Sequence, residues 1–185
     1  MKGFLFTSYI YEYFNFKVIS QLSKFSTSSE ILINSKVDKV WTLLTKTSHL
    51  ELVHPFCKSH KKLVWDDKNK IDQLTYINGL TYERNFYNFE KNKGFKLMIG
   101  KKDGKKSRVV WRLNPLNEKT YLSIRVTPYI SEKYHLITYN FLLIFYILPL
   151  LKKYLNSVTK GIKYYLEEGL SVKQNQFGKH KWFSS

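Results

Sequence analysis

Cysteine is almost missing from this 185-residue chain, which has Cys57 and no other. One thiol cannot close an intramolecular disulfide, and it cannot supply the several thiolates of a structural zinc cluster. A chain that does without disulfides is typical of a reducing compartment. We therefore expect a cytoplasmic protein. Whether it also lies at the surface of a membrane is left open at this point.

Catalytic and metal-binding motifs are also missing. There is no glycine-rich phosphate loop, and neither Cys57 nor any serine has a recognisable partner for nucleophilic catalysis. His49, His54 and His60 match no standard spacing of metal ligands, so we interpret them as surface or capping side chains. We predict no catalytic residue, no metal and no cofactor. An enzyme stays open as an alternative, because a shaped pocket can act by positioning a reactive substrate.

Acidic residues are scarce: 14 Asp and Glu stand against 31 Lys and Arg, which gives a formal net charge of +17. Such a surface favours anionic partners, either lipid headgroups or nucleic acid. Biased base composition in a genome also enriches lysine, so the charge alone does not select a function. Because no nucleic-acid-binding motif accompanies the basic residues, a nucleic-acid-binding or scaffold role is the least favoured alternative.

One long apolar run covers residues 136–151 and is interrupted only by Thr138, Asn140 and Pro149. A bilayer span needs about 20 apolar residues, so this run, with a helix-breaking proline near its end, is too short to span comfortably. We expect it to begin a long helix and to touch an anionic membrane surface. The predicted membrane contacts are Phe141, Leu142, Phe145, Lys152 and Lys153.

The chain divides into three parts. Residues 1–24 are rich in aromatic side chains, but Glu12 interrupts them and no cleavage site of small residues follows. We therefore predict an N-terminal appendage rather than a signal peptide. Residues 25–170 form one predicted domain of ordinary size, and residues 171–185 form a C-terminal tail.

The start of the domain predicts one strand and two short helices. Alternating apolar residues favour a strand over residues 25–34. Ser35 with Asp38, and Ser48 with Glu51, have the spacing of capping boxes, in which the serine and the acidic side chain satisfy the first N–H groups of a helix.

From residue 60 to residue 128 the apolar period changes to two, as in strands. Asn78-Gly79 and Asp103-Gly104 predict two-residue hairpins of type I′, and such short turns force neighbouring strands to run antiparallel. Six further strands are predicted at residues 61–65, 71–77, 80–89, 95–100, 108–114 and 121–127.

One face of this meander is apolar and must be covered. The predicted cover is the C-terminal helix, where apolar side chains recur at helical spacing up to Gly169. The order of elements predicts an α+β helix-grip fold. In it, a curved seven-stranded antiparallel sheet wraps around a long C-terminal helix, and two short helices lie between strands 1 and 2.

Several segments resemble a known superfamily. They are residues 31–41 (ILINSKVDKVW), 110–115 (VWRLNP), 154–158 (YLNSV), 161–166 (GIKYYL) and 175–184 (NQFGKHKWFS). With this order of elements, the chain from about residue 25 to its end resembles the START/Bet v 1-like (SRPBCC) superfamily, in particular its polyketide cyclase/dehydrase-type and uncharacterised bacterial members. The resemblance implies a deep hydrophobic cavity between the sheet and the long helix, typically used to hold lipids, sterols, polyketides or other apolar molecules.

Strand alternation nominates the side chains that would line such a cavity. Arg84 shares a strand face with Phe86, so an inward guanidinium could bind a ligand carboxylate or phosphate. A surface pair with Glu83 or Glu90 is the alternative for Arg84. The full predicted set is Leu74, Tyr76, Arg84, Phe86, Leu97, Trp111, Leu113, Leu122 and Ile124 from the strands, with Tyr154 and Val158 from the C-terminal helix.

These observations favour binding, or transfer, of a hydrophobic, lipid-like small molecule. A polyketide cyclase/dehydrase-type enzyme is the first alternative and would bring polar groups such as Arg84, Tyr76 and His135 together in the cavity. Side chains that simply fill one another in a packed core are the other open interpretation.

Overall fold

The computed structural model describes residues 25–129 and 136–184; the predicted appendage, residues 1–24, lies outside them, as does His135. The chain forms one antiparallel sheet in the order β1-β7-β6-β5-β4-β3-β2. The strands are β1 (Thr27–Ile33), β2 (Cys57–Trp65), β3 (Lys70–Tyr76), β4 (Thr81–Glu90), β5 (Gly94–Gly100), β6 (Ser107–Leu116) and β7 (Lys119–Thr127). The seven predicted strands are confirmed, and β2 begins four residues earlier than predicted.

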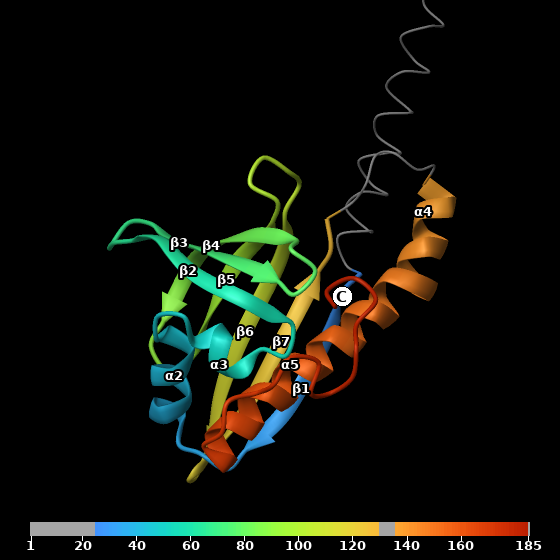
Figure 1. Ribbon diagram of the computed structural model, residues 1–185. Helices are drawn as coiled ribbons and strands as arrows, with labels where there is room; N and C mark the ends of the chain where they lie inside the picture. The colour runs from blue at the N-terminus through green and yellow to red at the C-terminus, as the bar shows by residue number, and fades with distance from the viewer. Residues whose placement is uncertain (1–24, 130–135, 185) are drawn as a thin grey trace, which may run out of the picture.

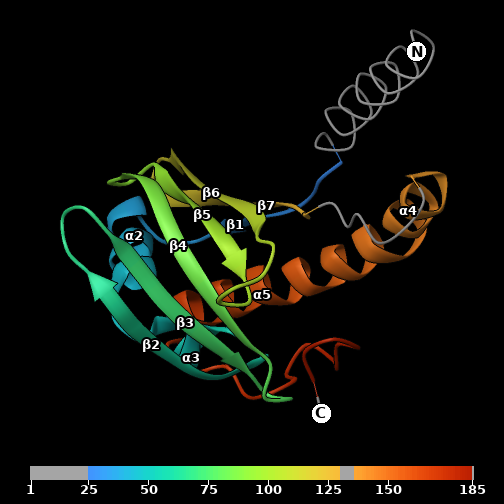
Figure 2. The ribbon, with the colours of Figure 1, turned by 90° about the horizontal axis from the view of Figure 1, so that it is seen from above.

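The sheet curves around helix α5 (Leu148–Glu168), which crosses its concave face (Figures 1 and 2). Helices α2 (Val37–Thr45) and α3 (His49–Val53) lie at the end of the sheet opposite to helix α4 (Leu136–Leu142). Neighbouring strands place apolar side chains side by side; Trp111, for example, pairs with Ile124. This is the predicted helix-grip fold.

A glycine sets the distance between α5 and the loop after α3. A Cβ atom at Gly161 would lie 2.1 Å from the carbonyl oxygen of Val53. Only glycine permits this approach, because real Cβ atoms do not come so close to backbone atoms. The approach brings α5 against the segment that carries His54 and Pro55.

The predicted capping boxes are wrong. Lys36 occupies the N-cap position of α2 and makes no side-chain cap bond. The Ser48 hydroxyl donates to the carbonyl of His60 (2.9 Å), and a Glu51 carboxylate oxygen accepts from the backbone N–H of His60 (2.8 Å). The reason is that β2 is an edge strand, so His60 would otherwise leave a backbone donor and acceptor unpaired.

The predicted type I′ turns are wrong too, although the antiparallel pairing that they imply holds. At the first turn Gly79 has a positive φ of 86°, while Asn78 does not. The Gly79 N–H donates to the carbonyl of Tyr76 (2.9 Å), and the Tyr76 N–H donates to the carbonyl of Leu80 (2.8 Å). This is a three-residue loop with glycine at the left-handed position. Asp103 and Gly104 both keep negative φ in a longer loop.

Pro149 does not break the long helix, contrary to its predicted effect. Between α4 and α5 the chain forms one π-helical turn, η1 (Leu143–Ile147), and Pro149 stands in the first turn of α5. Proline has no N–H and crowds the carbonyl one turn earlier. The wider π turn changes the hydrogen-bond register just before the proline, so the helix continues.

The C-terminal tail packs on the domain. The Val172 N–H donates to the carbonyl of Leu52 (2.9 Å), and the Asn78 side-chain amide donates to the carbonyl of Trp182 (2.8 Å). The Phe183 ring stacks on Tyr76 with ring centres 4.2 Å apart. The tail therefore contributes a wall to the interior of the grip.

Candidate ligand-binding cavity

A cavity of about 1060 Å³ lies between the concave face of the sheet, the long helix and the tail. Ligand pockets in proteins usually measure roughly 300–1,000 Å³, so this volume suits a whole small molecule rather than a few waters. Most of the wall is apolar. It includes Leu74, Leu97, Val109, Trp111, Ile124, Val126, Leu151, Leu155, Val158 and Phe183.

Most of the predicted cavity residues meet around this space. Leu74, Tyr76, Arg84, Leu97, Trp111, Ile124, Tyr154 and Val158 all line it. They come from β3, β4, β5, β6, β7 and α5, which are far apart in sequence and are brought together by the curl of the sheet.

Phe86, Leu113 and Leu122 do not line the cavity, which corrects their predicted placement. Phe86 belongs to an aromatic cluster, with ring centres 5.4 Å from Trp65 and 5.3 Å from Phe95. Leu113 and Leu122 are paired across β6 and β7 and are fully buried in packed core. The alternation of apolar and polar residues assigned all three side chains to the inner face of the sheet. It could not show which parts of that face pack against other side chains and which border the cavity.

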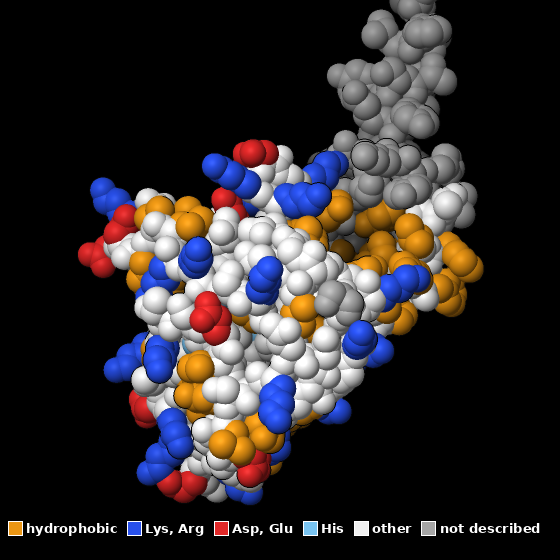
Figure 3. Space-filling view, in the orientation of Figure 1, with side chains coloured by type: hydrophobic (Ala, Val, Ile, Leu, Met, Phe, Trp, Pro, Cys, Tyr) orange, Lys and Arg blue, Asp and Glu red, His pale blue; other side chains and the backbone are white. Residues whose placement is uncertain are grey.

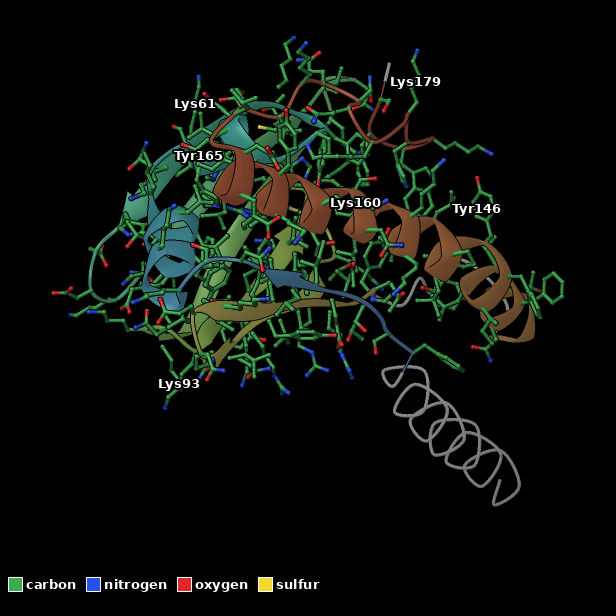
Figure 4. The ribbon with its side chains drawn as sticks, turned by 90° about the horizontal axis from the view of Figure 1, so that it is seen from below. Lys61, Lys93, Tyr146, Lys160, Tyr165 and Lys179 are labelled. Carbon is green, nitrogen blue, oxygen red and sulfur yellow. The ribbon has the colours of Figure 1, made fainter. Side chains whose placement is uncertain are left out.

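Among the described residues, exposed and half-buried parts of the lining lie at the α4 end of the molecule, and we call them the rim. The rim comprises Lys101, Gly104 and Lys105 of the β5–β6 hairpin, Pro128 and Tyr129 after β7, and Leu142 and Tyr146 of the helix. Figure 4 shows Lys160 on α5 and Tyr146 further along the same continuous helix, toward α4. Figure 3 shows apolar side chains gathered over the α4 end, close to lysine and arginine side chains.

Arg84 points inward, as one of its two interpretations predicted, but its partner is neither Glu83 nor Glu90. Arg84 is 4% exposed and stands directly opposite Asp72 on β3. Its Nε and Nη2 each donate to one oxygen of that carboxylate at 2.6 Å. The guanidinium is therefore held in a buried bidentate ion pair, and Asp72 neutralises its charge.

His60 completes this cluster from β2. Its Nε2 lies 2.9 Å from Asp72 Oδ2, which can only accept, and 3.0 Å from Arg84 Nη2, which can only donate. Burial would raise the pKa of Asp72, but the charge of Arg84 and the hydrogen bonds from His60 and Arg84 outweigh it and lower the pKa to about 2. Asp72 and Arg84 are thus both charged and cancel each other beside the cavity.

A second polar chain joins α5 to the loop after α3. The backbone N–H of Phe56 donates to His54 Nδ1 (3.2 Å), so the neutral ring carries its hydrogen on Nε2. His54 Nε2 donates to the Tyr154 hydroxyl (2.8 Å), which lies 3.1 Å from the Tyr76 hydroxyl. His54, Tyr76 and Tyr154 all line the cavity.

These groups stay uncharged near neutral pH. Burial, followed by the charge of Arg84, lowers the pKa of His54 to about 3. Burial also raises the pKa of Tyr76 and of Tyr154 well above the ordinary value of a phenol. The buried end of the cavity therefore offers hydrogen-bonding groups without net charge.

We predicted surface or capping positions for the three histidines. The surface position is wrong, since His49, His54 and His60 are 3%, 5% and 2% exposed, whereas His54 does occupy the C-cap position of α3. They do not form one cluster of three: the His49 and His60 rings are in edge contact, with centres 5.0 Å apart, while His54 bonds to Tyr154. Within residues 25–129 and 136–184, no three His, Cys, Asp or Glu side chains are grouped to hold a metal ion.

Sequence reasoning missed Asp72 and His54. Asp72 was detectable, because it lies two residues before Leu74 on the inner face of the same strand, where a carboxylate needs a partner. His54 carried no such signal. It occupies the C-cap position of a five-residue helix, and only the approach of α5 brings Tyr154 to it.

The predicted membrane contacts lie on two parts of the long helix, the α4–η1 part and the start of α5. Phe141 and Phe145 are each 66% exposed, and their rings are 4.6 Å apart. Leu142 faces the cavity instead. Lys152 and Lys153 are exposed on α5, and Lys152 donates from Nζ to the carbonyl of Ser28.

Judged by length and composition alone, the helix over Thr138–Glu168 could cross a membrane. Its most apolar part has a mean hydropathy of 1.4, and 22% of that part is buried in the fold. The α5 half contributes Leu155, Val158 and Ile162 to the core under the sheet, so that half cannot leave the sheet without exposing the core.

No protein-family model matches the chain, and no curated protein matches it. Several solved structures do match it. A START superfamily protein from Mycobacterium smegmatis is 14% identical, with a TM-score of 0.59 over 77% of this chain and 97% of that one. DynU16 of the dynemicin biosynthetic locus is 14% identical, with a TM-score of 0.60 over 81% of this chain and 50% of that one.

CalU16 from Micromonospora echinospora is 14% identical, with a TM-score of 0.54 over 78% of this chain and 77% of that one. At such identities the likeness shows the fold. The chain has the START-like helix-grip fold, which is the fold that the resemblance of its segments implied.

Proposed function

We propose that this protein binds a hydrophobic, lipid-like small molecule in the cavity and exchanges it at the surface of an anionic membrane. The observation that carries the proposal is the cavity itself: about 1060 Å³, apolar along its walls, with a few hydrogen-bonding groups at its buried end. Small-molecule sites have this composition. A packed core does not leave so large a space, because protein interiors contain few voids larger than a water molecule.

The membrane part of the proposal is supported by the position of the exposed aromatic pair. Phe141 and Phe145 lie on the same helical turns as Leu142 and Tyr146, which form the rim of the cavity. If this pair enters the headgroup region, the cavity opens toward the apolar layer, and a ligand crosses little water on its way in. Basic side chains on the opposite rim, such as Lys101, attract anionic headgroups.

Native mass spectrometry of the freshly purified protein tests ligand binding. We expect an apolar adduct that is lost on denaturation. Leu151→Trp fills the cavity from α5 and should abolish the adduct, whereas Lys160→Trp, exposed on the same helix, should keep it. The proposal fails if neither the unmodified protein nor Lys160→Trp retains or takes up an added lipid.

Vesicle flotation tests membrane contact. Phe141→Ser/Phe145→Ser should lose binding to vesicles that contain phosphatidylglycerol. Tyr87→Ser/Tyr121→Ser is the matched control, because it removes two exposed aromatic rings from strands β4 and β7. Equal flotation of the two double variants would contradict the membrane proposal.

A cyclase/dehydrase-type enzyme is the second candidate, and one observation favours it: two tyrosine hydroxyls inside an apolar cavity can hold a reacting carbonyl oxygen. Such chemistry also needs a proton acceptor that works near neutral pH. His54 has its pKa lowered to about 3, and Asp72 is committed to Arg84. Binding without chemistry therefore fits the described residues better. Turnover of a polyketone that is lost in Tyr76→Phe would reverse this preference.

A further inference from the structure

The polar chain at the buried end of the cavity has one donor more than it has acceptors. Four hydrogens enter the chain, from the Phe56 N–H, the His54 Nε2–H and the hydroxyls of Tyr154 and Tyr76. Three atoms inside it can accept them: His54 Nδ1 and the two hydroxyl oxygens. Whichever tyrosine donates to the other, one O–H is left with no partner among the described residues.

Both tyrosines that can carry this spare hydrogen line the cavity. Tyr76 is 1% exposed, and both tyrosine rings form part of the cavity wall, next to Leu74 and Leu155. A buried donor without a partner costs free energy comparable to a lost hydrogen bond. An acceptor atom inside the cavity would complete the arrangement.

The charges at this end restrict what that acceptor can be. The guanidinium of Arg84 is neutralised by Asp72, and His54 is neutral. An ionised carboxylate or phosphate placed here would lose its hydration and gain no net positive charge in return. A neutral oxygen loses much less hydration and can still accept the hydrogen bond.

We propose that the ligand carries a neutral acceptor oxygen, as in a ketone, ester or alcohol, and that this oxygen accepts a hydrogen bond from Tyr76 or Tyr154 at the buried end of the cavity. This inference rests on the proposed binding function and specifies the class of molecule bound. The apolar body of the ligand lies along Leu97, Trp111 and Val158, and its other end reaches the rim.

Four probes with the same hydrocarbon chain test the inference on the unmodified protein: methyl laurate, lauryl alcohol, sodium laurate and dodecane. Each competes at neutral pH with a fluorescent apolar dye bound in the cavity. We expect methyl laurate and lauryl alcohol to displace the dye at about threefold to tenfold lower concentrations than dodecane, as one added hydrogen bond predicts. Laurate should be weaker than both.

Variants locate the donor. In Tyr76→Phe/Tyr154→Phe the preference for methyl laurate over dodecane should disappear, while dodecane binding stays. Tyr82→Phe is the matched control: Tyr82 lines the same cavity but makes no hydrogen bond with the polar chain, so its variant should keep the preference. The readout is the ratio of the methyl laurate and dodecane concentrations that displace the dye from one variant. A smaller folded fraction affects both concentrations equally and leaves this ratio unchanged.

Laurate as the tightest probe, or a double variant that keeps the preference, would overturn the inference. Equal binding of all four probes would overturn the inference and leave the proposed function standing. If no probe displaces the dye, dodecane included, the proposed function fails and the inference fails with it.

Discussion

Replacing Asp72 with asparagine should destabilise the fold far more than the same change in an exposed ion pair. Asp72 is 1% exposed and accepts two hydrogen bonds of 2.6 Å from Arg84. Asparagine keeps the size of the side chain but removes its charge and one of its acceptor oxygens. The guanidinium would then stay buried with no opposite charge beside it.

Two routes give the size of the effect. Breaking a buried ion pair from one side typically costs about 3–5 kcal/mol, because the remaining charge is uncompensated. The pKa of Asp72, lowered from 3.8 to about 2, corresponds to about 2 kcal/mol in favour of the charged carboxylate. The second figure is smaller because it compares the carboxylate with a protonated acid that still fits the site. We expect a loss of about 2–5 kcal/mol in the free energy of unfolding.

Urea unfolding followed by tryptophan fluorescence measures this loss. Glu118→Gln is the matched control, since Glu118 pairs with Lys36 at 2.9 Å but both side chains are mostly exposed. The double variant Asp72→Leu/Arg84→Met removes both charges and should recover most of the stability. Equal urea midpoints for Asp72→Asn and Glu118→Gln would refute the reasoning.

Two further predictions concern packing and pH. Gly161→Ala should lower the melting temperature, although alanine ordinarily stabilises a helix by about 1 kcal/mol, because its Cβ would lie 2.1 Å from the Val53 carbonyl oxygen; a raised melting temperature would contradict this contact. His49 and His54 both have pKa values lowered from 6.5 to about 3, first of all by burial. Between these values the unfolded chain binds more protons, so stability should fall as the pH drops below about 6.5, by up to about 1.4 kcal/mol per pH unit for each histidine. Urea midpoints at several pH values measure this slope, and His54→Gln should reduce it; a midpoint that stays constant between pH 6.5 and pH 4 would contradict the burial of both rings as neutral groups.

The elements of the fold were predictable because their signals are periodic and repeated. Six strands in a row alternate apolar and polar side chains, and a single misread residue does not change the pattern. The caps and turns failed because each depends on one or two residues. Ser48 and Glu51 have the spacing of a capping box, but the unpaired edge of β2 offered them partners outside their own helix.

The cavity was predictable in outline and not in detail. Alternation identified the inner face of each strand, which is why most of the predicted residues line the cavity. It gave no information on the depth along that face, so it could not separate Leu113 in packed core from Trp111 at the cavity wall. The pairing of Asp72 with Arg84 needed the register of β3 against β4, and sequence periodicity does not supply a register.

The apolar run at the start of the long helix has no polar face because its sides meet three different surroundings. Tyr139 and Leu143 form a small buried cluster with the start of the domain. Leu142 faces the cavity, where an apolar wall is needed whether or not a ligand is bound. Phe141 and Phe145 are the two most exposed large apolar side chains among the described residues. The first two surroundings explain the apolar residues that lie in them, and neither explains the aromatic pair. An exposed pair next to the opening of an apolar cavity is best explained by a surface that the cavity opens toward, which is why vesicle binding by Phe141→Ser/Phe145→Ser tests the membrane half of the proposed function and leaves the cavity intact.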